Sequence, residues 1–536
     1  MRINPAAALG DLSVVLRAWG LRPLRPQTML AVGRQIRREG VRPHLVLTIH
    51  AMETPDRPAL VHGGRTVSWS AELDRVRRLA NHLLARGIGP GERLAIMLAN
   101  RPEFVEAQAA ALWVGATAAV VNPRAPVSEA LSLLERTKPR LLITHRDDLS
   151  GAQMPILAVG DEYEQAVSSA SAAEPRVPKD AEGKLVIFTS GTTGRPKGAV
   201  RSLDQGASLS TLAGFLRVIP FRRDDVHMVV CPLYHSSGSG FAAVSEILGN
   251  PLVLVERFSL ETFCRTVQEH KVTTAAVVPT MLHRLCEFED AASYDLSSLR
   301  VVVCTGAPLR EQARERARAL LGDVVHDLYG STEMGWVSVA TPRDQRLKPG
   351  SVGKPVPAVE VRIQGPQGEP LPAGEVGEVW ARSNLSMQGY LDDDELGADR
   401  VRDGFVSVKD LGYLDADGYL FVVDRADDMI ISGGVNVYPA EAEVALNGHP
   451  AVSECAVVGL PDDRWGQKVV AAVVPRGDVG AEELLDWCRE RVSYAAVPKE
   501  VRFVLELPRN DIGKVATRQL AQDLAKLPGP DEGLEP

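Results

Sequence analysis

The residues best suited to chemistry stand in one short run, FTSGTTGRPKG, at positions 188–198. Glycines permit backbone conformations and close approaches that a side chain would block. The serine and the threonines supply hydroxyl donors, and Lys197 supplies a positive charge. Because the run follows KLVIF, which is typical of a buried strand, it predicts a loop that wraps an oxyanion such as the phosphates of a nucleotide. The alternative interpretation of TSGTTG alone is a flexible linker.

The spacing of this run excludes two common phosphate loops. A Walker A loop needs lysine directly after its second glycine and then serine or threonine. Here Gly194 is followed by Arg195 and Pro196, and Lys197 is followed by Gly198. No GxGxxG motif closes a strand–helix turn either. The sequence therefore predicts a phosphate loop of another type.

Three later stretches carry further reactive side chains: DLYGSTE at 327–333, KDLGYLDADGYLFVVDRADDMIISGGVNVYPAE at 409–441 and LPRNDIGKVATRQL at 507–520. An aromatic face can stack on a base, and threonine and glutamate oxygens suit Mg²⁺. Asp410 can accept hydrogen bonds from ribose hydroxyls, and Arg425 is a cation with a planar fork that suits phosphate or ribose. The alternative interpretation of DLYGSTE is a polar strand-to-helix turn, and Asp410 and Arg425, taken singly, are more typical of surface charges.

These stretches must be positioned by a regular scaffold. Short β-rich runs alternate with helical ones from about residue 46 to 424, as in RLAIML, EFVEAQAAALWVG, ATAAVVN, VSEALSLLERT and RLLITH. This βαβαβ alternation predicts a parallel sheet covered by helices. It resumes at KLVIFTS, VTTAAVVPT, SLRVVVCTGAPL and VVHDLYGSTE. Ligand sites in such sheets gather at the carboxyl ends of the strands, where the motifs stand.

The length of 536 residues indicates more than one domain. We expect an α/β fold with a large N-terminal domain of helix-covered, mainly parallel sheets at 46–424. A small α+β C-terminal domain is expected at 425–536. Residues 1–45 form a separate basic extension.

The extension carries eight arginines against Asp11 and Glu39, and its apolar residues recur roughly at helical spacing. A basic amphipathic segment can lie on an anionic membrane surface. The favoured alternative is a helical pair packed on the main body, because Pro23 and Pro26 interrupt the pattern.

Composition narrows the classes of partner. The net charge of −9 makes nucleic acid an unexpected partner. Six cysteines lie far apart without metal-ligand spacing, which predicts reduced, buried thiols. The longest apolar stretch, at 109–121, is shorter than the roughly 20 residues of a membrane span, and no signal peptide is recognisable. We expect a cytoplasmic location, with peripheral membrane contact through residues 1–45 as the alternative, and the sequence leaves the oligomeric state open.

The four stretches, in this order and at these separations, resemble the adenylate-forming superfamily of acyl-CoA synthetases, peptide-synthetase adenylation domains and luciferases. The resemblance extends from about residue 50 to 525 and is strongest to bacterial fatty-acyl-CoA ligases. It implies a two-step reaction with ATP, Mg²⁺ and coenzyme A. A carboxylate attacks the α-phosphate of ATP to give an acyl-adenylate and pyrophosphate, and a thiol then displaces AMP.

The resemblance also implies roles for individual residues. The loop on the β- and γ-phosphates comprises Thr189, Ser190, Gly191, Thr192, Thr193, Gly194 and Lys197. The nucleoside site comprises Gly306, Ala307 and Pro308 at the adenine, Asp327 at its amino group, Tyr329 stacking on the base, Gly330 and Ser331 in the same loop, and Asp410 and Arg425 at the ribose. Thr332 is implied to contact the α-phosphate, Glu333 to bind Mg²⁺, and Lys514 to bridge the carboxylate and the α-phosphate.

Further implied roles concern the second step. The small domain is implied to be mobile, with a hinge near Asp427. Its rotation is implied to bring Gly433 and Gly434 to the thiol channel, where glycine lets backbone approach closely. His235, in PLYHSSG, is implied to gate the acyl and thiol side, and Trp336 lines the acyl pocket or packs in the core. One departure from the family stands at Val408-Lys409-Asp410, where Thr-Gly-Asp is common.

The resulting hypothesis is an ATP-dependent acid–thiol ligase that forms an acyl-CoA, with a medium- or long-chain fatty acid as the expected substrate. Within the superfamily, the alternatives are a ligase that loads a separate carrier protein and a ligase for aryl or other carboxylates. Outside it, the alternatives are a nucleotide-binding regulator without catalysis and a membrane-surface scaffold. The presence of Lys514, Glu333 and Asp410 argues against the regulator.

Overall fold

The computed structural model describes residues 5–20, 22–149, 151–189, 197–202, 209–391, 400–425, 429–432, 435–462, 465–510 and 513–526. By its internal contacts the chain divides into two compact units. Unit 1 comprises Met1–Val361 and Ala381–Val406, and unit 2 comprises Arg362–Trp380 and Ser407–Pro536. The expected boundary between residues 424 and 425 stays a prediction, and by contact density residues 407–424 belong with the C-terminal unit.

In the described part of unit 1, seven strands form one sheet in the order β18-β8-β7-β4-β3-β5-β6. Strands β7, β4, β3, β5 and β6 run parallel, whereas β8 and β18 are antiparallel additions. The bounds are β3 (Arg93–Met97), β4 (Thr117–Val120), β5 (Leu141–Thr144), β6 (Ile156–Ala158), β7 (Lys184–Thr189), β8 (Lys197–Ser202) and β18 (Gly389–Tyr390). The predicted phosphate loop therefore joins two paired strands, β7 and β8.

A second sheet of unit 1 has the order β15-β14-β13-β12-β11-β9-β10-β1-β2 over the residues that are described. Its strands from β13 to β1 are parallel, and β14, β15 and β2 are antiparallel. The bounds are β1 (Pro58–His62), β2 (Arg65–Ser68), β9 (His227–Val229), β10 (Leu252–Leu254), β11 (Thr274–Val277), β12 (Val301–Thr305), β13 (Val325–Ser331), β14 (Gly335–Ala340) and β15 (Lys354–Pro355). Both sheets confirm the predicted βαβ alternation, since their β-branched runs are almost fully buried.

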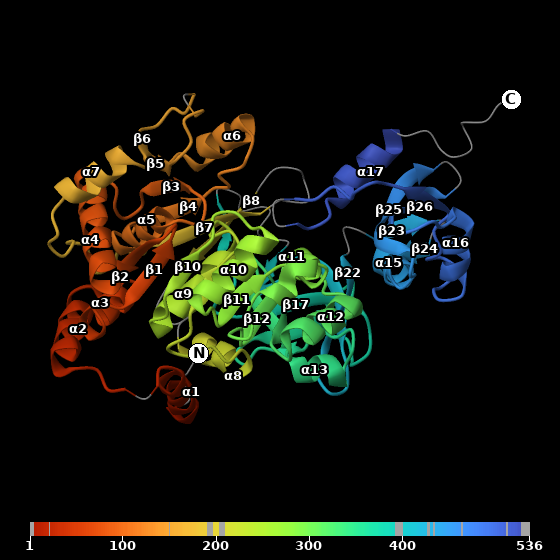
Figure 1. Cartoon of the computed structure of the whole chain (residues 1–536), viewed down its shortest axis with the longest axis horizontal. Helices are drawn as coiled ribbons and strands as arrows, with labels where there is room; N and C mark the ends of the chain where they lie inside the picture. The colour runs from red at the N-terminus through yellow and green to blue at the C-terminus, as the bar shows by residue number, and fades with distance from the viewer. Residues whose placement is uncertain are drawn as a thin grey trace. The chain divides into compact units, whose positions relative to one another are not determined.

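Helices cover these sheets, and Figure 1 shows α4, α5 and α7 on the sheet that contains β3. The bounds are α1 (Pro5–Ala18), α2 (Pro26–Glu39), α3 (Leu45–Glu53), α4 (Trp69–Ala85), α5 (Pro102–Trp113), α6 (Val127–Thr137), α7 (Asp161–Ser169), α8 (Leu209–Val218), α9 (Ser236–Leu248), α10 (Leu260–His270), α11 (Pro279–Cys286), α12 (Glu311–Leu321) and α13 (Pro342–Leu347). This unit also contains a short 3-10 helix (Glu289–Ser293) and a short hairpin, β19 (Val401–Arg402) and β20 (Phe405–Val406). The six cysteines are free and five are buried, as expected.

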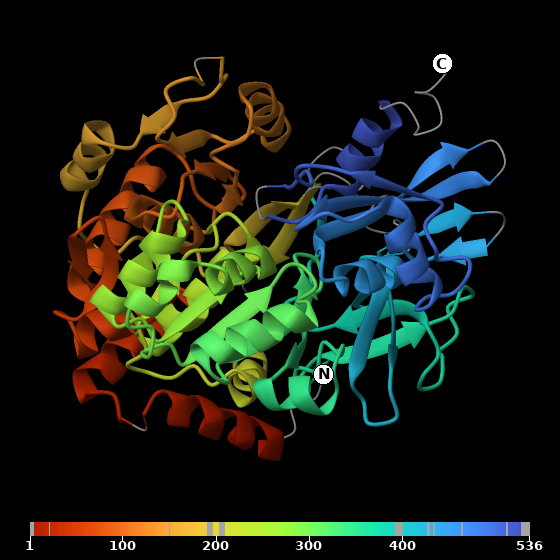
Figure 2. The same cartoon turned by 45° about the vertical axis from the view of Figure 1, so that its right-hand side comes forward.

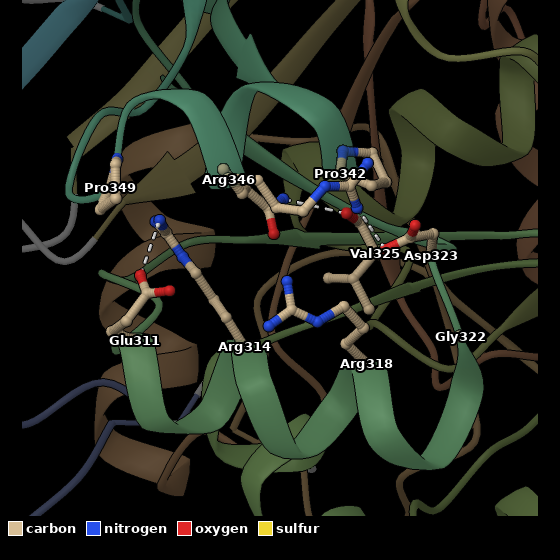
Figure 3. A pocket seen from close by; sticks show the side chains of 10 residues that line it. Glu311, Arg314, Arg318, Gly322, Asp323, Val325, Pro342, Arg346 and Pro349 are labelled. Atoms are coloured by element: carbon tan, nitrogen blue, oxygen red, sulfur yellow. Dashed lines mark hydrogen bonds and ion pairs between the residues drawn. The ribbon is translucent and has the colours of Figure 1, made fainter.

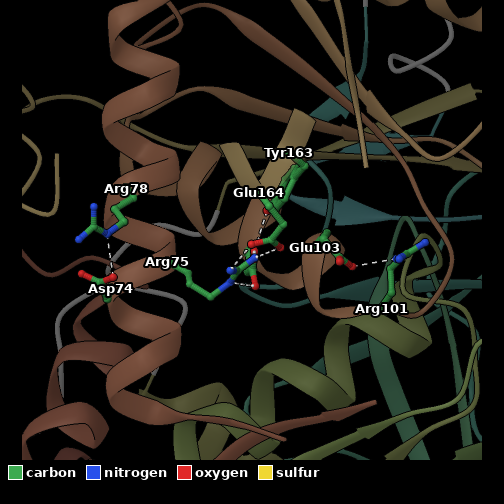
Figure 4. A network of polar contacts seen from close by, with 8 residues as sticks. Asp74, Arg75, Arg78, Arg101, Glu103, Tyr163 and Glu164 are labelled. Atoms are coloured by element: carbon green, nitrogen blue, oxygen red, sulfur yellow. Dashed lines mark hydrogen bonds and ion pairs between the residues drawn. The ribbon is translucent and has the colours of Figure 1, made fainter. Parts of the chain in front are cut away.

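A buried ion-pair network ties three of these helices together (Figure 4). Arg75 of α4 contacts Glu106 of α5 at 2.6 Å and Glu164 of α7 at 2.8 Å. The hydroxyl of Tyr163 donates to the second Glu106 oxygen at 2.8 Å. Because the Glu106 carboxylate is buried, removing one partner would strand a charge at a cost of about 3–5 kcal/mol.

The described part of the N-terminal extension, residues 5–20 and 22–45, packs on unit 1, as the helical-pair alternative expects. Helix α1 lies against α8, where Arg217 contacts Asp11 at 2.7 Å. The backbone N–H of Arg223 donates to the Ala18 carbonyl at 2.8 Å. In Figure 2 the dark red helix α1 lies along the outside of unit 1.

Among the residues described, no helix has the length and apolar character needed to cross a membrane.

Unit 2 confirms the predicted small α+β domain. Strand β26 pairs antiparallel with β25 and parallel with β27. The other pairings are antiparallel: β23 with β24 and β26, and β21 with β22. The bounds are β21 (Asp410–Leu414), β22 (Leu420–Arg425), β23 (Ile430–Ser432), β24 (Val435–Val437), α15 (Pro439–Asn447), β25 (Val452–Asp462), β26 (Gly466–Pro475), α16 (Ala481–Arg489), β27 (Glu500–Phe503) and α17 (Thr517–Lys526). Strand β17 (Gly377–Arg382) pairs with β21, and β16 (Glu360–Gln364) pairs with β17.

A buried histidine makes the stability of unit 1 depend on pH. His227 of β9 is 1% exposed, and its Nδ1 lies 2.9 Å from the Thr274 hydroxyl. Burial lowers the pKa of His227 from 6.5 to about 3. Below pH 6.5 the unfolded chain therefore takes up a proton that the folded chain refuses, and stability falls as the pH falls.

We expect the substitution His227→Gln to flatten this dependence. Its amide can keep the Thr274 hydrogen bond but does not titrate, so the slope of unfolding free energy against pH between 6 and 4 should fall by about 1.4 kcal/mol per pH unit. Urea titrations across this pH range measure the slope. His270→Gln, at an exposed position, is the control and should leave it unchanged. Equal slopes for wild type and His227→Gln would contradict the assignment.

Candidate functional site

Strand β8 begins with Lys197, the only predicted phosphate-loop residue whose side chain is described. Its ammonium lies 5.7 Å from the ring centroid of Tyr390, on the neighbouring strand β18. The Tyr390 hydroxyl in turn donates to Glu333 at 3.3 Å. All three side chains are buried or nearly so. The fold thus brings the predicted phosphate cation and the predicted metal ligand to one aromatic ring.

The turn that carries Thr332 and Glu333 is held from β8. The Arg201 guanidinium donates to the Thr332 carbonyl at 3.0 Å and to the Ser331 carbonyl at 3.4 Å. Lys197 and Arg201 are four residues apart on β8, so they share a face of the strand. Burial lowers the pKa of Arg201 to about 10, which still leaves it charged at neutral pH. Arg201 therefore fixes the backbone of the turn.

The Thr332 side chain points to a second element. Its hydroxyl lies 3.1 Å from the hydroxyl of Ser236, at the start of α9. The neighbouring Gly330 permits the turn to close, because a Cβ there would lie 2.2 Å from the Gly335 carbonyl oxygen. The β13–turn–β14 segment is thus compact, with Thr332 directed toward α9.

The predicted adenine residues gather at the carboxyl ends of two adjacent parallel strands. Gly306 directly follows β12, and Tyr329 stands near the end of β13, with Thr305 and Leu328 in register. The φ of Gly306 is +93°, a conformation that side chains disfavour. Ala307 and Pro308 continue the same loop. The structure therefore brings these residues together as the sequence predicted, and their contact with adenine stays a prediction.

Asp327 has a partner that the sequence did not indicate. Its Oδ2 accepts a bond of 2.6 Å from Arg314 of α12, and both side chains are 6% exposed. Burial raises the pKa of Asp327, and Arg314 opposes that rise. At least one of its oxygens is committed to this ion pair, so any adenine contact would use the other.

A cavity of about 230 Å³ lies beside this ion pair, between α12 and α13 (Figure 3). Its lining includes Glu311, Arg314, Arg318, Asp323 and Arg346. Arg346 contacts Asp323 at 2.6 Å, and Arg314 lies 3.5 Å from Glu311. Because acidic partners balance most of these guanidinium charges, the cavity is a weak candidate for an anion site.

His235 stands at the N-terminal end of α9, next to Ser236. Burial lowers the pKa of His235 to about 4, so its ring is neutral at physiological pH. A neutral ring suits a gate better than a charged group, although the gating role stays a prediction. Trp336 lies 4.5 Å from Phe215 and 5.9 Å from Phe241 between ring centroids, as in core packing, yet it is only partly buried.

In unit 2 the two predicted ribose residues are paired. Asp410 and Arg425 face each other on β21 and β22, and Arg425 Nε donates to Asp410 Oδ1 at 2.9 Å. Lys409, which replaces the family's common glycine, has a φ of +64°. Its N–H donates to the Ser407 hydroxyl at 2.9 Å. The backbone therefore keeps the conformation that glycine favours, at some conformational cost.

Lys514 stands in a tight turn of unit 2. The Asn510 side chain accepts from the Lys514 N–H at 2.9 Å, and Gly513 has a φ of +74°. The remaining predicted residues lie outside the described part: the side chain of Thr189, the hinge residue Asp427, Gly433 and Gly434, and the loop residues Ser190, Gly191, Thr192, Thr193 and Gly194.

The donor set fits Mg²⁺ held jointly with a nucleotide. Among the described residues, no group of three or more His, Cys, Asp or Glu side chains could hold a metal ion. Mg²⁺ commonly uses one or two carboxylates together with substrate phosphates. Glu333, close to the Lys197 cation, could supply such a carboxylate.

Sequence reasoning missed Arg201, Tyr390 and Ser236. Arg201 binds backbone carbonyl groups, which every residue has, so no sequence pattern marks its partners. Tyr390 reaches Lys197 only because β18 pairs with β8 across nearly 200 residues of chain. Ser236 directly follows the predicted His235, so its hydroxyl was the one signal available.

Comparison with known families matches most of the chain. The model described as AMP-binding enzyme matches residues 47–391, and the model described as AMP-binding enzyme C-terminal domain matches 441–514. The chain is 36% identical to a feruloyl-CoA synthase from Amycolatopsis, over 87% of this chain and 95% of that protein. It is 33% identical to a 2-succinylbenzoate–CoA ligase from Bacillus licheniformis, over 87% and 97% of the two chains.

Solved structures of related enzymes also match most of this chain. The o-succinylbenzoate CoA synthetase of Bacillus subtilis, in complex with its acyl-adenylate intermediate, is 30% identical with a TM-score of 0.78, covering 89% of this chain and 97% of that one. Another structure of that synthetase, with ATP and a magnesium ion, has a TM-score of 0.79 at 30% identity and covers 89% and 98%. An amide bond synthetase from Marinactinospora thermotolerans is 29% identical, with a TM-score of 0.80 and coverage of 90% and 99%.

We expect Lys409→Gly to stabilise unit 2, because glycine adopts a φ of +64° without the penalty that a Cβ incurs. The gain should be about 1 kcal/mol. Chemical denaturation measures it, and Lys184→Gly in the extended strand β7 is the matched control, which should lose stability instead. A destabilised Lys409→Gly variant would show that the lysine side chain itself holds this corner.

Proposed function

We propose an aryl or related carboxylate as the acid substrate of this chain, which belongs to the AMP-binding enzyme family and is an AMP-forming acid–CoA ligase. The observation that carries the proposal is its 36% identity to a feruloyl-CoA synthase over 87% of the chain. The 2-succinylbenzoate–CoA ligases also have an aromatic acid in their name. This replaces the expectation of a fatty acid, which none of these relatives supports.

The ligase reaction has two balanced steps. A carboxylate oxygen attacks the α-phosphorus of ATP, the bond to the bridging oxygen breaks, and pyrophosphate leaves with its electron pair. The sulfur of coenzyme A then attacks the acyl carbon of the acyl-adenylate. AMP leaves as the second product, and the thiol proton passes to solvent.

Within unit 1 we assign Lys197 to the β- and γ-phosphates and Thr332 to the α-phosphate. The support is that Lys197 lies beside the Tyr390 ring, whose hydroxyl bonds Glu333, the neighbour of Thr332. Glu333 would hold Mg²⁺, which supplies charge neutralisation at the phosphate oxygens when bound. Arg201 touches neither ATP nor acid in this scheme. It positions the turn through the Ser331 and Thr332 carbonyls.

Within unit 2 we assign Asp410 to the ribose hydroxyls, with Arg425 orienting its carboxylate through the 2.9 Å bond. Lys514 would bridge the acid and the α-phosphate in the first step. A cation placed at developing negative charge can contribute several kcal/mol to such a transfer. The phosphate loop at 190–194 and the glycines at 433 and 434 keep the roles implied by their motifs.

The aromatic cluster offers a wall for a planar acid. Phe215 and Phe241 are fully buried, whereas Trp336 keeps part of its ring accessible. Trp336 is carried on β14, directly after the turn that bears Thr332 and Glu333. An accessible indole that follows Thr332 and Glu333, the residues assigned to the α-phosphate and to Mg²⁺, suits stacking on an aryl ring.

A second acceptor class has one observation in its favour. The similarity to an amide bond synthetase, at 29% identity, makes an amine a candidate to replace the thiol in the second step. A carrier-protein thiol is the third candidate. The first step is the same for all three, so the acceptor can be tested separately from the acid.

The test is pyrophosphate release by the full chain with ATP, Mg²⁺ and one acid at a time, followed by mass spectrometry of the product with coenzyme A. Ferulate or 2-succinylbenzoate should exceed hexadecanoate in kcat/KM on the order of tenfold or more, and a CoA thioester should form. Preference for long fatty acids would restore the earlier expectation. If an added amine gives an amide and no thioester forms, the acceptor would be assigned as an amine instead of coenzyme A.

Lys514→Ala separates the two steps in this test. It should lower adenylation by about 100- to 1,000-fold and leave thioester formation from supplied acyl-adenylate largely intact. Lys526→Ala, at an exposed lysine of the same unit, is the control. Equal loss in both steps would contradict the role assigned to Lys514.

A further inference from the structure

Helix α2 buries polar side chains and exposes large apolar ones, which is the reverse of an ordinary surface helix. It begins at Pro26 and ends before Gly40, whose φ is +81°. Its buried side chains are Thr28, Gln35 and Glu39, at 0–2% exposure. A helix on a soluble body normally buries apolar residues there and exposes polar ones.

The apolar residues of α2 instead point to solvent. Met29 is 60% exposed, Leu30 is 61% exposed and Ile36 is 38% exposed. At about 100° per residue, Leu30 lies on the side of the helix opposite to Thr28 and Gln35, Met29 lies between the two sides, and Ile36 flanks the buried side. Gly33 lies between them, and no atom comes within 4 Å of where its Cβ would stand.

Two arginines share this outward face. Arg34 and Arg37 are exposed, and neither has an ion pair or hydrogen bond with the residues that the structure describes. Arg38 and Arg42, in contrast, attach the end of α2 to the body: Arg38 donates to Glu174 at 2.8 Å and Arg42 to the Lys179 carbonyl at 3.0 Å. The orientation of α2 on unit 1 is therefore fixed, with its apolar and basic residues outward.

We propose that the outward face of α2, defined by Met29, Leu30, Arg34 and Arg37, docks on an anionic membrane surface. Apolar side chains enter the headgroup boundary while arginines beside them contact anionic lipid, as in interfacial helices. Charge favours a bilayer over a second copy of the chain, because two copies facing each other would bring Arg34 and Arg37 together with their equivalents. The inference does not depend on which acid the enzyme activates.

The test is co-sedimentation of the full chain with vesicles of phosphatidylcholine alone and of phosphatidylcholine mixed with phosphatidylglycerol. Binding is expected only to the mixed vesicles, and it should weaken at high salt because exposed charges are screened. The double variant Arg34→Glu/Arg37→Glu should reduce the bound fraction on the order of tenfold or more. Leu30→Glu should do the same, since it removes the apolar contact.

Leu347→Glu, at another leucine of unit 1 that is 58% exposed, is the matched control and should bind like wild type. Ligase activity without vesicles should be unchanged in every variant, which shows that they fold. Wild type that stays in the supernatant, or charge-reversed protein that binds as well as wild type, would overturn the proposal. A dimer in light scattering that Leu30→Glu dissociates, without vesicle binding, would assign the face to a second copy instead.

Discussion

The site in unit 1 depends on one guanidinium, that of Arg201, which joins the two sheets. It leaves β8 of the seven-stranded sheet and donates to the Ser331 and Thr332 carbonyls of the turn after β13, in the nine-stranded sheet. Lys197 stands on the same face of β8, so one strand carries both the predicted phosphate cation and the guanidinium that holds the turn. A charge-assisted bond to a carbonyl is among the stronger neutral-pH contacts a protein can make. Together with the Tyr390 hydroxyl, which bonds Glu333, it positions Thr332 and Glu333 relative to Lys197.

The scaffold could be predicted from the sequence because its signals are local. Continuous β-branched runs mark buried parallel strands such as β7, β11 and β12, and helical spacing marks α5 and α6. The pairs that complete the site are non-local. Tyr390 reaches Lys197 through strand pairing, and Arg314 reaches Asp327 from the preceding helix α12, so neither contact follows from residue type or spacing. Lys409 has a φ of +64°, so the backbone keeps the conformation that glycine favours even though the sequence shows a lysine there.

The substrate was predicted less well than the chemistry, for a physical reason. Adenylation needs fixed groups at fixed separations, and these stand in short motifs such as YGSTE. In our proposal, recognition of the acid depends on packing among residues such as Phe215, Phe241 and Trp336, which come from three different elements. The exposed apolar side chains of α2 also could not be predicted from the sequence alone. Helical spacing in residues 1–45 predicted an amphipathic helix, but only the packed structure shows that its apolar side is the one left outside.

The most direct measurement for the central claim is a crystal structure of this chain with ATP and Mg²⁺. The account predicts the triphosphate against Lys197, with the metal ion on Glu333 and the α-phosphate within hydrogen-bond distance of Thr332. A triphosphate bound away from residues 189–197, with Lys197 still over the ring of Tyr390, would contradict the assignment of this cluster as the adenylation site.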